Sequence, residues 1–394
     1  MDMMMALCLV LLALTLGDVI SAMTKAFVPS VFVSAIIFVI GFWTIFPADI
    51  VDLSGIGNPL AQLAILLLIT HMGTLMSLKE LASQWRTIII SLAGIVGICV
   101  GAVALGTVVF DWETAIIATP PLTGGLVASI MMADAATAKG LNDLAVLAIL
   151  VYVAQGFAGY PLTSILLRKE GNKLLSDFRS GKIKSSAKSE VEETIKEESK
   201  LRIIPKLPEK YDTTYMVLLR VAIVALVAVK LEGLTGGTIS KYVIALVLGA
   251  IASEMGLIDR KPLVKSGSFG ILITSLMAFV MAGLAKATPD TLAEMAMPLI
   301  GIIVFGVVGM GIFSIIAGKL LGISKEMSFA VALTALYGFP PNYIITEDVS
   351  KALAETPEEK EFLMDQMLPQ MLVGGFTTVT IASVIIAGLF INLI

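Results

Sequence analysis

Long apolar stretches recur along the whole chain and restrict its possible folds more than any other feature. A bilayer hydrocarbon core about 30 Å thick is crossed by a helix of about 20 mostly apolar residues. Ten stretches approach or reach this length. They cover residues 3–16, 27–46, 58–78, 87–110, 142–167, 214–229, 240–255, 266–284, 295–320 and 370–393. The sequence therefore predicts an all-α polytopic membrane protein, and we expect the first stretch to be a span and not a removable signal peptide.

Charge is scarce and unevenly placed. Charged residues make up 15% of the 394 residues and hydrophobic residues 57%, whereas a soluble domain carries about 25% charge. Residues 168–212 hold 12 of the 27 Lys and Arg and 9 of the 31 Asp and Glu, which is 21 of 58 charges. The remaining 349 residues therefore hold only 37 charges, too few to cover a surface that faces water.

The same composition excludes several functional classes. A net charge of -4 without a basic stripe outside one loop argues against a nucleic-acid partner. Cys8 and Cys99 both lie in apolar stretches, and His71 is the single histidine. A Cys/His metal site or a Ser/His or Cys/His catalytic machine is therefore not expected. The apolar stretches hold no paired carboxylates either, so we expect neither an enzyme nor a bound cofactor.

Two further apolar stretches, 114–139 and 328–347, each contain a Pro-Pro pair, Pro120–Pro121 and Pro340–Pro341. Proline lacks an N–H and clashes with the preceding turn, so two in succession interrupt a helix. A non-helical stretch at membrane depth must be buried in protein or line a wet cavity. We therefore expect each stretch to form a re-entrant hairpin.

The loop charges predict an orientation. Cytoplasmic loops carry an excess of Lys and Arg. Lys25, Lys79 and Arg86 follow the first and third spans, whereas Asp111 follows the fourth. If 114–139 re-enters without crossing, the charged loop after the fifth span also lies inside. We expect both termini outside, a cytoplasmic central loop and insertion in the inner (plasma) membrane.

The order of elements in the first half recurs in the second. Residues 63–102 and 269–309 are each an apolar span, a short polar loop and a glycine-spaced apolar span. Each is followed by a Pro-Pro hairpin and one more span. Because five spans is an odd number, the second copy is inverted relative to the first, which is typical of secondary transporters. We predict two inverted repeats, 1–168 and 213–394, each with five transmembrane helices and one re-entrant hairpin, joined by a charged linker at 169–212.

The first hairpin tip suits an anion. Gly124 and Gly125 permit close backbone approach, and the amides that start the following half-helix favour a carboxylate. Thr119, Thr123 and Ser129 add hydroxyl groups. The alternative is a tight connector between two short core helices.

The second tip suits a cation. Gly338 and the prolines break the helix, and the carbonyls freed by such a break are ligands that sodium accepts. Asn342 either contacts substrate or caps the second half-helix. The predicted substrate ligands are Thr123, Gly124, Gly125, Ser129, Gly338 and Asn342, and the predicted ion ligands are Thr119, Pro120, Asp134, Tyr337 and Phe339.

Other polar residues in the spans leave alternatives open. Asp134 either lines the cavity or ends the hairpin. His71 is either a packed histidine near the interface or a proton relay. Tyr152 and Gln155 follow the first hairpin and are plausible wall residues of the same cavity.

Several stretches resemble the bacterial sodium/glutamate symporter (ESS) family: Val-Pro-Ser-Val-Phe-Val at 28–33, the span and basic loop at 63–86, the hairpin at 118–141 with Thr123-Gly124-Gly125, and the spans at 254–283 and 298–309. The resemblance implies ten spans, two re-entrant hairpins, a homodimer, and sodium-driven uptake of an acidic amino acid by an elevator-like movement. The chain departs from the family at residues 126–128, where Leu-Val-Ala replaces His-Gly-Thr, and at the second tip.

The leading hypothesis is therefore sodium-coupled symport of glutamate or a similar small carboxylate by an elevator-type alternating-access mechanism. The closest alternative is a proton-coupled organic anion transporter or exporter that uses Asp134 or His71 as its relay. A third possibility is a passive pore or a holin-like regulatory membrane protein. Two matched broken hairpins favour a closed binding site, because a pore needs only one continuous lining.

Overall fold

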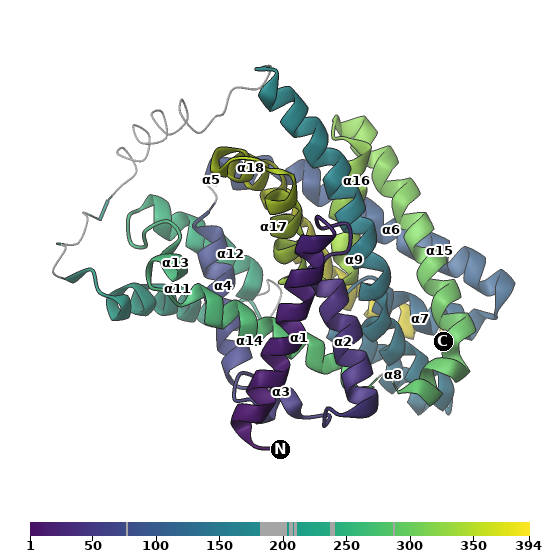
Figure 1. The fold of residues 1–394 in the computed structure, drawn as a ribbon. Helices are drawn as coiled ribbons and strands as arrows, with labels where there is room; N and C mark the ends of the chain where they lie inside the picture. The colour runs from purple at the N-terminus through teal and green to yellow at the C-terminus, as the bar shows by residue number, and fades with distance from the viewer. Residues whose placement is uncertain (76–77, 182–202, 205–207, 209–210, 237–240, 287) are drawn as a thin grey trace. The chain divides into compact units, whose positions relative to one another are not determined.

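The computed structural model describes residues 1–394 except 76–77, 182–202, 205–207, 209–210, 237–240 and 287 (Figure 1). Every regular element in this described part is helical. Most of the predicted linker at 169–212 lies outside the described residues, but helix α9 (Asn142–Arg179) continues eleven residues beyond 168.

Among the described residues, five helices are long and apolar enough to cross a membrane. They are α1 (Met3–Met23), α6 (Trp85–Val109), α9, α11 (Thr214–Leu234) and the segment Leu292–Leu321 of α15 (Pro289–Leu321). The prediction of a helical membrane protein is confirmed at this level. The predicted spans at 27–46, 58–78, 240–255 and 266–284 form shorter helices, namely α2 (Ser30–Thr44), α4 (Leu60–Gly73), α12 (Lys241–Glu254) and α14 (Phe269–Ala282).

The chain divides into two compact units, each drawn from both halves of the sequence. Unit 1 comprises residues 1–7, 51–84 and 176–280, and it contains α4, α5 (Leu78–Ser83), α11, α12, α13 (Pro262–Lys265) and α14. Its helices α4 and α12 are in close contact, because a Cβ built on Gly73 would lie 2.1 Å from the carbonyl oxygen of Leu246. Buried His71 packs its ring on Phe269 and accepts a hydrogen bond from the Leu263 amide.

Unit 2 comprises residues 8–50, 85–175 and 281–394. Besides α1, α2, α6, α9 and α15, it contains α7 (Trp112–Leu122), α8 (Leu126–Ala138), η2 (Gly283–Lys286), α16 (Lys325–Leu333), η3 (Thr334–Leu336), α17 (Pro341–Leu353), α18 (Pro357–Thr377), the π-helix η4 (Thr378–Ala382) and α19 (Ser383–Ile391). The short helix α3 (Ile50–Leu53) lies where the two units join along the chain.

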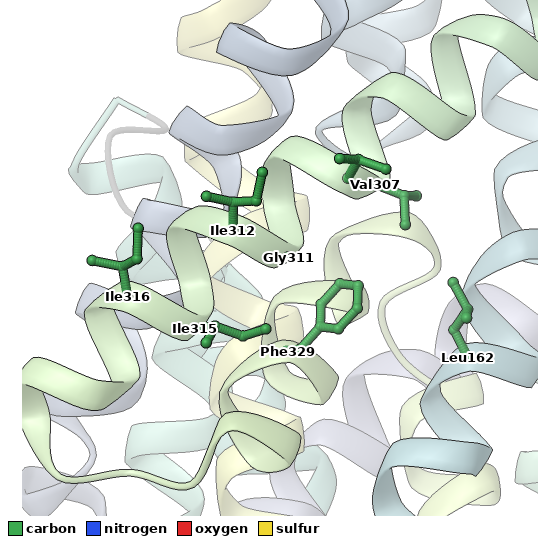
Figure 2. A pocket seen from close by; sticks show the side chains of 8 residues that line it. Leu162, Val307, Gly311, Ile312, Ile315, Ile316 and Phe329 are labelled. Atoms are coloured by element: carbon green, nitrogen blue, oxygen red, sulfur yellow. The ribbon is translucent and has the colours of Figure 1, made fainter.

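Helices α6 and α15 form the centre of unit 2 and approach each other through glycines. A Cβ on Gly97 would lie 2.4 Å from the carbonyl oxygen of Gly309, and one on Gly101 would lie 2.4 Å from that of Phe305. Such contacts are typical of membrane helices, where small residues let two backbones pack directly. The outer face of α15 stays exposed, with Val308, Ile312 and others along an apolar groove (Figure 2).

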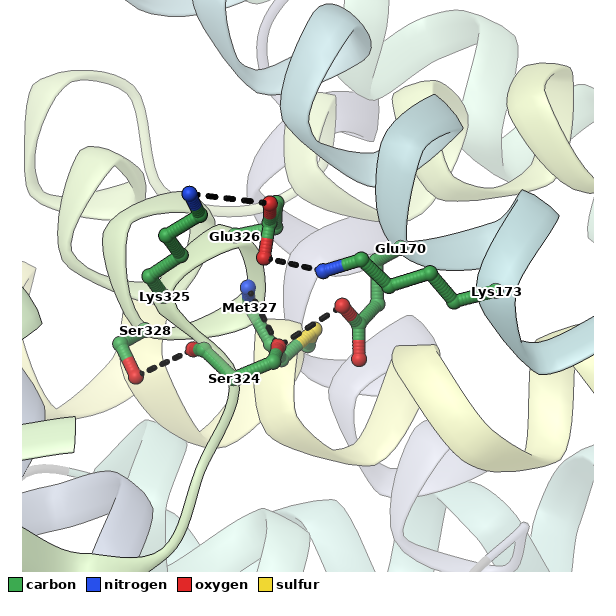
Figure 3. Close-up of polar contacts among 7 residues, drawn as sticks. All are labelled: Glu170, Lys173, Ser324, Lys325, Glu326, Met327 and Ser328. Carbon is green, nitrogen blue, oxygen red and sulfur yellow. Dashed lines mark hydrogen bonds and ion pairs between the residues drawn. The ribbon is translucent and has the colours of Figure 1, made fainter. Parts of the chain in front are cut away.

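A polar network joins the end of α9 to the turn between α15 and α16 (Figure 3). Ser324 caps α16 by accepting from the Met327 amide, and it donates a 2.7 Å hydrogen bond to Glu170. Lys173 lies 2.5 Å from the carboxylate of Glu326. This hydrogen bond from Lys173 is the main reason why the pKa of Glu326 lies below its usual 4.5.

Replacing Gly97 with Leu should strongly destabilise unit 2, because the new side chain meets backbone atoms that cannot move aside. We expect a loss of about 3 kcal/mol in the free energy of unfolding, as for an overpacked core, measured by thermal or chemical unfolding in detergent. Gly388→Leu is the matched control, since a Cβ at Gly388 has nothing within 4 Å. Equal stability of the two variants would contradict the close packing of α6 on α15.

The contribution of Glu326 to the stability of the folded protein should depend on pH. Its folded pKa is lowered, so its stabilisation is present above the unfolded pKa and is lost as the pH falls through the folded value. At neutral pH, Glu326→Gln should therefore lower the melting temperature, and the gap to the parent protein should close under strongly acidic conditions. In a Lys173→Gln background, adding Glu326→Gln should change the melting temperature much less at every pH. A melting-temperature difference that persists in that background would mean that Glu326 is stabilised by a partner other than Lys173.

Candidate functional site

The first helix break separates α7 from α8 in unit 2. Sequence analysis placed the interruption at Pro120–Pro121, but these prolines form the last turn of α7 and the break follows at residues 123–125. Proline's fixed φ is compatible with a helix, so α7 accommodates both residues despite the missing hydrogen bonds and the clash of each ring with the preceding turn. Gly124 and Gly125 have φ values of +105° and +99°, and this conformation is what ends the helix.

The second break lies where sequence analysis expected it. Helix α16 tightens into η3 and ends at Tyr337, and α17 begins at Pro341. Gly338 has a φ of +61°, which favours glycine at this position. Pro341 occupies the first position of its helix, where a missing N–H costs no hydrogen bond.

The two breaks lie together at Val379 in the π-helix η4. A Cβ on Gly124 would lie 2.6 Å from the carbonyl oxygen of Ala335 and 3.3 Å from Val379. A Cβ on Gly338 would lie 3.0 Å from the same valine side chain, and one on Gly125 would lie 3.1 Å from its carbonyl oxygen. The first break thus meets the backbone near Ala335 and Val379, and the second break packs on the Val379 side chain, inside unit 2.

The buried hydroxyl groups of the first break are oriented by their own helix. Thr119 donates a 2.6 Å hydrogen bond to the carbonyl of Ala115, and Thr123 donates a 2.8 Å bond to that of Pro120. Because each hydroxyl proton is already donated to a backbone carbonyl, only the lone pairs of the two hydroxyl oxygens remain for a further partner. Ser129 is also fully buried, one turn into α8.

The first turn of α8 provides the complementary charge. Its N-cap is Gly125, which has no side chain to accept from the amides of that turn. The N-terminal amides of a helix carry a partial positive charge and suit an anionic group. The start of α17 differs, because Asn342 Oδ1 accepts from the Tyr343 amide there at 2.7 Å.

The other predicted residues of the second break are engaged in packing. Asn342 is fully buried and donates a 2.9 Å bond to the carbonyl of Met371. The Tyr337 hydroxyl lies 2.6 Å from Thr163 Oγ1 on α9, and its ring packs on Tyr160. The ring of Phe339 packs on Phe376, with centroids 5.9 Å apart. Of the two interpretations of Asn342, these contacts favour the one in which it holds α17 in place.

One buried polar atom in this region has no partner among the described residues: Oε1 of Gln155, whose residue is 1% exposed. Two residues on the same face of α9, Ala148 and Gly159, indicate where Gln155 lies. Two turns earlier, Ala148 packs in one cluster with Ala128 and Met132 of α8. One turn later, a Cβ on Gly159 would lie 2.7 Å from the Tyr337 ring. Because residues four and seven apart share a helix face, Gln155 faces the region between the two breaks.

The structure does not bring every predicted residue to this place. Asp134 is exposed, on the side of α8 opposite buried Met132. His71 belongs to unit 1. Sequence analysis missed Val379 and Thr163, because no local signal distinguishes a π-helix or a hydroxyl that contacts a distant tyrosine. The one sequence feature next to Val379 that indicates an unusual helix is the Gly-Gly-Phe-Thr-Thr run at 374–378.

The site therefore combines a helix N-terminus for an anion with hydroxyl and amide oxygens for a cation or an N–H donor. Its described polar side chains are neutral. No family model matches the chain, and no curated protein is significantly similar to it.

Proposed function

We propose that the protein is a secondary active transporter that couples sodium to the uptake of glutamate or a similar small carboxylate. The observation that carries this proposal is the meeting of two helix breaks at Val379. It is supported by Oε1 of Gln155, which lies one turn before the contact of Gly159 with Tyr337 and has no hydrogen-bond partner among the described residues. Broken helices whose ends face one another are how many transporters hold a substrate and its coupling ion.

Each chemical part of the site has a role in this proposal. The amides of the first turn of α8 bind the substrate carboxylate, with Gly124 and Gly125 allowing close approach. The hydroxyl oxygens of Thr119 and Thr123 and the carbonyls at residues 337–340 coordinate sodium, which prefers oxygen ligands. Gln155 Oε1 accepts a hydrogen bond from the substrate ammonium group or joins the sodium ligands.

The proposed mechanism is of the elevator type and uses a homodimer of two inverted repeats. The stretches 114–139 and 328–347, which contain the two breaks, act as re-entrant hairpins, with both termini outside the inner membrane and the linker in the cytoplasm. The division of the chain into two compact units supports this mechanism, since an elevator needs two bodies that each hold together while one moves.

Transport by purified protein in liposomes tests the proposal. Labelled glutamate and a panel of small carboxylates are offered under an imposed sodium gradient, an imposed proton gradient, or neither. Saturable uptake and counterflow that require sodium would support it. Uptake driven by protons alone would favour the proton-coupled alternative, and flux without counterflow would favour a passive pore.

Gly125→Val should reduce uptake by about tenfold or more, because a side chain at a φ of +99° costs about 1–3 kcal/mol and it also meets Ser383. Gly140→Val is the matched control. Gly140 also has a positive φ, +78°, but has nothing within 4 Å. Equal uptake by the two variants would remove the first break from the mechanism.

Gln155→Leu should separate transport from stability. The substitution keeps the side-chain volume but removes an acceptor, so we expect the KM for substrate or sodium to rise about tenfold or more. Thermal stability should be unchanged or higher, because the folded protein no longer buries an unsatisfied amide. Gln366→Leu, at an exposed position of α18, is the control for the same chemical change. Normal transport by Gln155→Leu would place the substrate elsewhere.

A further inference from the structure

An apolar groove of about 550 Å³ runs along the outside of unit 2, between α15, α16 and α9. Figure 2 shows the ring of Phe329 between the α15 side chains and Leu162 of α9. The ring packs on Gly311, where a Cβ would lie 3.1 Å from it. All the lining side chains are hydrocarbon.

The groove opens outward within a candidate membrane span. Val308, Ile312 and Ile316 line it and are 50%, 53% and 56% exposed. They lie in the segment Leu292–Leu321, which is apolar enough to cross a bilayer. The groove therefore suits a hydrocarbon chain.

Lysines continue the groove at one end on all three helices. On α15, Lys319 lies one turn beyond Ile315, and on α16, Lys325 lies one turn before Phe329. On α9, Lys169 lies two turns beyond Leu162. These positions share the faces of the lining residues, because residues four or seven apart are neighbours on a helix surface.

The polar network of Figure 3 shows that these three helix ends lie together. Glu170 of α9 accepts a hydrogen bond from Ser324, directly before α16, and Lys173 of α9 contacts Glu326. Counting Lys169, Lys173, Lys319 and Lys325 against Glu170 and Glu326, four positive charges face two negative ones, an excess of two. Lys173 lies 2.5 Å from one carboxylate oxygen of Glu326 and Lys325 lies 4.0 Å from the other, but the side chain of Lys325 is 73% exposed and Lys319 is also exposed.

The opposite end of the groove carries no charge. Ile303 and Val304 precede the lining residues on α15, Leu333 follows Phe329 on α16, and Ala158 precedes Leu162 on α9. The groove is thus hydrocarbon along its length and cationic at one end only.

We propose that this groove binds an anionic phospholipid, with an acyl chain along Val308, Ile312 and Phe329 and the headgroup phosphate at Lys319 and Lys325. Basic side chains near the membrane surface attract anionic lipids, and the unequal ends of the groove match the unequal ends of such a lipid. A neutral lipid has no net negative charge to interact with the cationic end. The proposal does not depend on the transport function.

Lipid binding to the full-length protein in a neutral detergent tests it. Delipidated protein is titrated with dioleoyl phosphatidylglycerol or dioleoyl phosphatidylcholine, and bound lipid is counted by native mass spectrometry. We expect phosphatidylglycerol to bind about tenfold more tightly or better, as two basic residues at the headgroup would give. The variant Lys319→Gln/Lys325→Gln should lose this preference. Lys79→Gln/Lys230→Gln, which removes the same charge from two exposed positions of unit 1, should keep it.

Two variants test the acyl-chain part of the groove. Val308→Trp should fill it and prevent binding of phosphatidylglycerol, and Ile312→Trp provides a second filled variant should the first fail to fold. Ile300→Trp is the control, because Ile300 is 62% exposed on the same helix but lies outside the groove. Equal affinity for the two lipids, or unchanged lipid binding by the filled variants, would overturn the proposal. A dimer that dissociates in the filled variants while lipid binding persists would assign the groove to a second copy and overturn it equally.

Discussion

Backbone amides and carbonyls at membrane depth must find partners inside the protein, because hydrocarbon offers none. The chain meets this requirement almost everywhere by forming helices. In unit 2, the helix breaks at residues 123–125 and 337–340 lie close to each other and to η4, and most of their residues are buried. This burial in protein is what the same rule requires of non-helical backbone.

Glycine makes both the core and the candidate site possible. At Gly97 and Gly309 it lets α6 and α15 touch backbone to backbone, at Gly124 it lets the first break approach the carbonyl of Ala335, and at Gly338 it makes room for the Val379 side chain. The physical reason differs between the two places. In the core only the absence of a Cβ is needed, whereas at the breaks the positive φ is required as well. Substitutions in the core should therefore cause overpacking, and substitutions at the breaks should strain the backbone as well.

The charged side chains of unit 2 lie apart from its two helix breaks. The described polar side chains at the breaks are neutral, and the N-terminal amides of α8 carry only the partial positive charge of a helix start. Ion pairs lie instead where α9 meets α16, through Lys173 and Glu326, and on α17 and α18, where Glu347 pairs with Lys351 and Lys360. The Asp348 carboxylate of α17 accepts hydrogen bonds from Ser21 and Ser30, which compensates the cost of burying a charge.

The sequence by itself determined the class of protein, because apolar stretches of membrane length can be satisfied only by helices, and it located both interruptions to within a few residues through Pro120 and Gly338. Only the tertiary structure decided which polar residues share a site. Asp134 and Ser129 lie on one helix, yet Asp134 is exposed and Ser129 is buried one turn from the break. Val379 lies in η4, whereas Thr163 and Gln155 lie on α9, more than 200 residues earlier in the sequence, and the packing that brings η4 and Tyr337 to their neighbours depends on glycine contacts that no local pattern encodes. The ion pair between Lys173 of α9 and Glu326 of α16 is likewise not predictable from the local sequence, because it forms only where the two helices pack together.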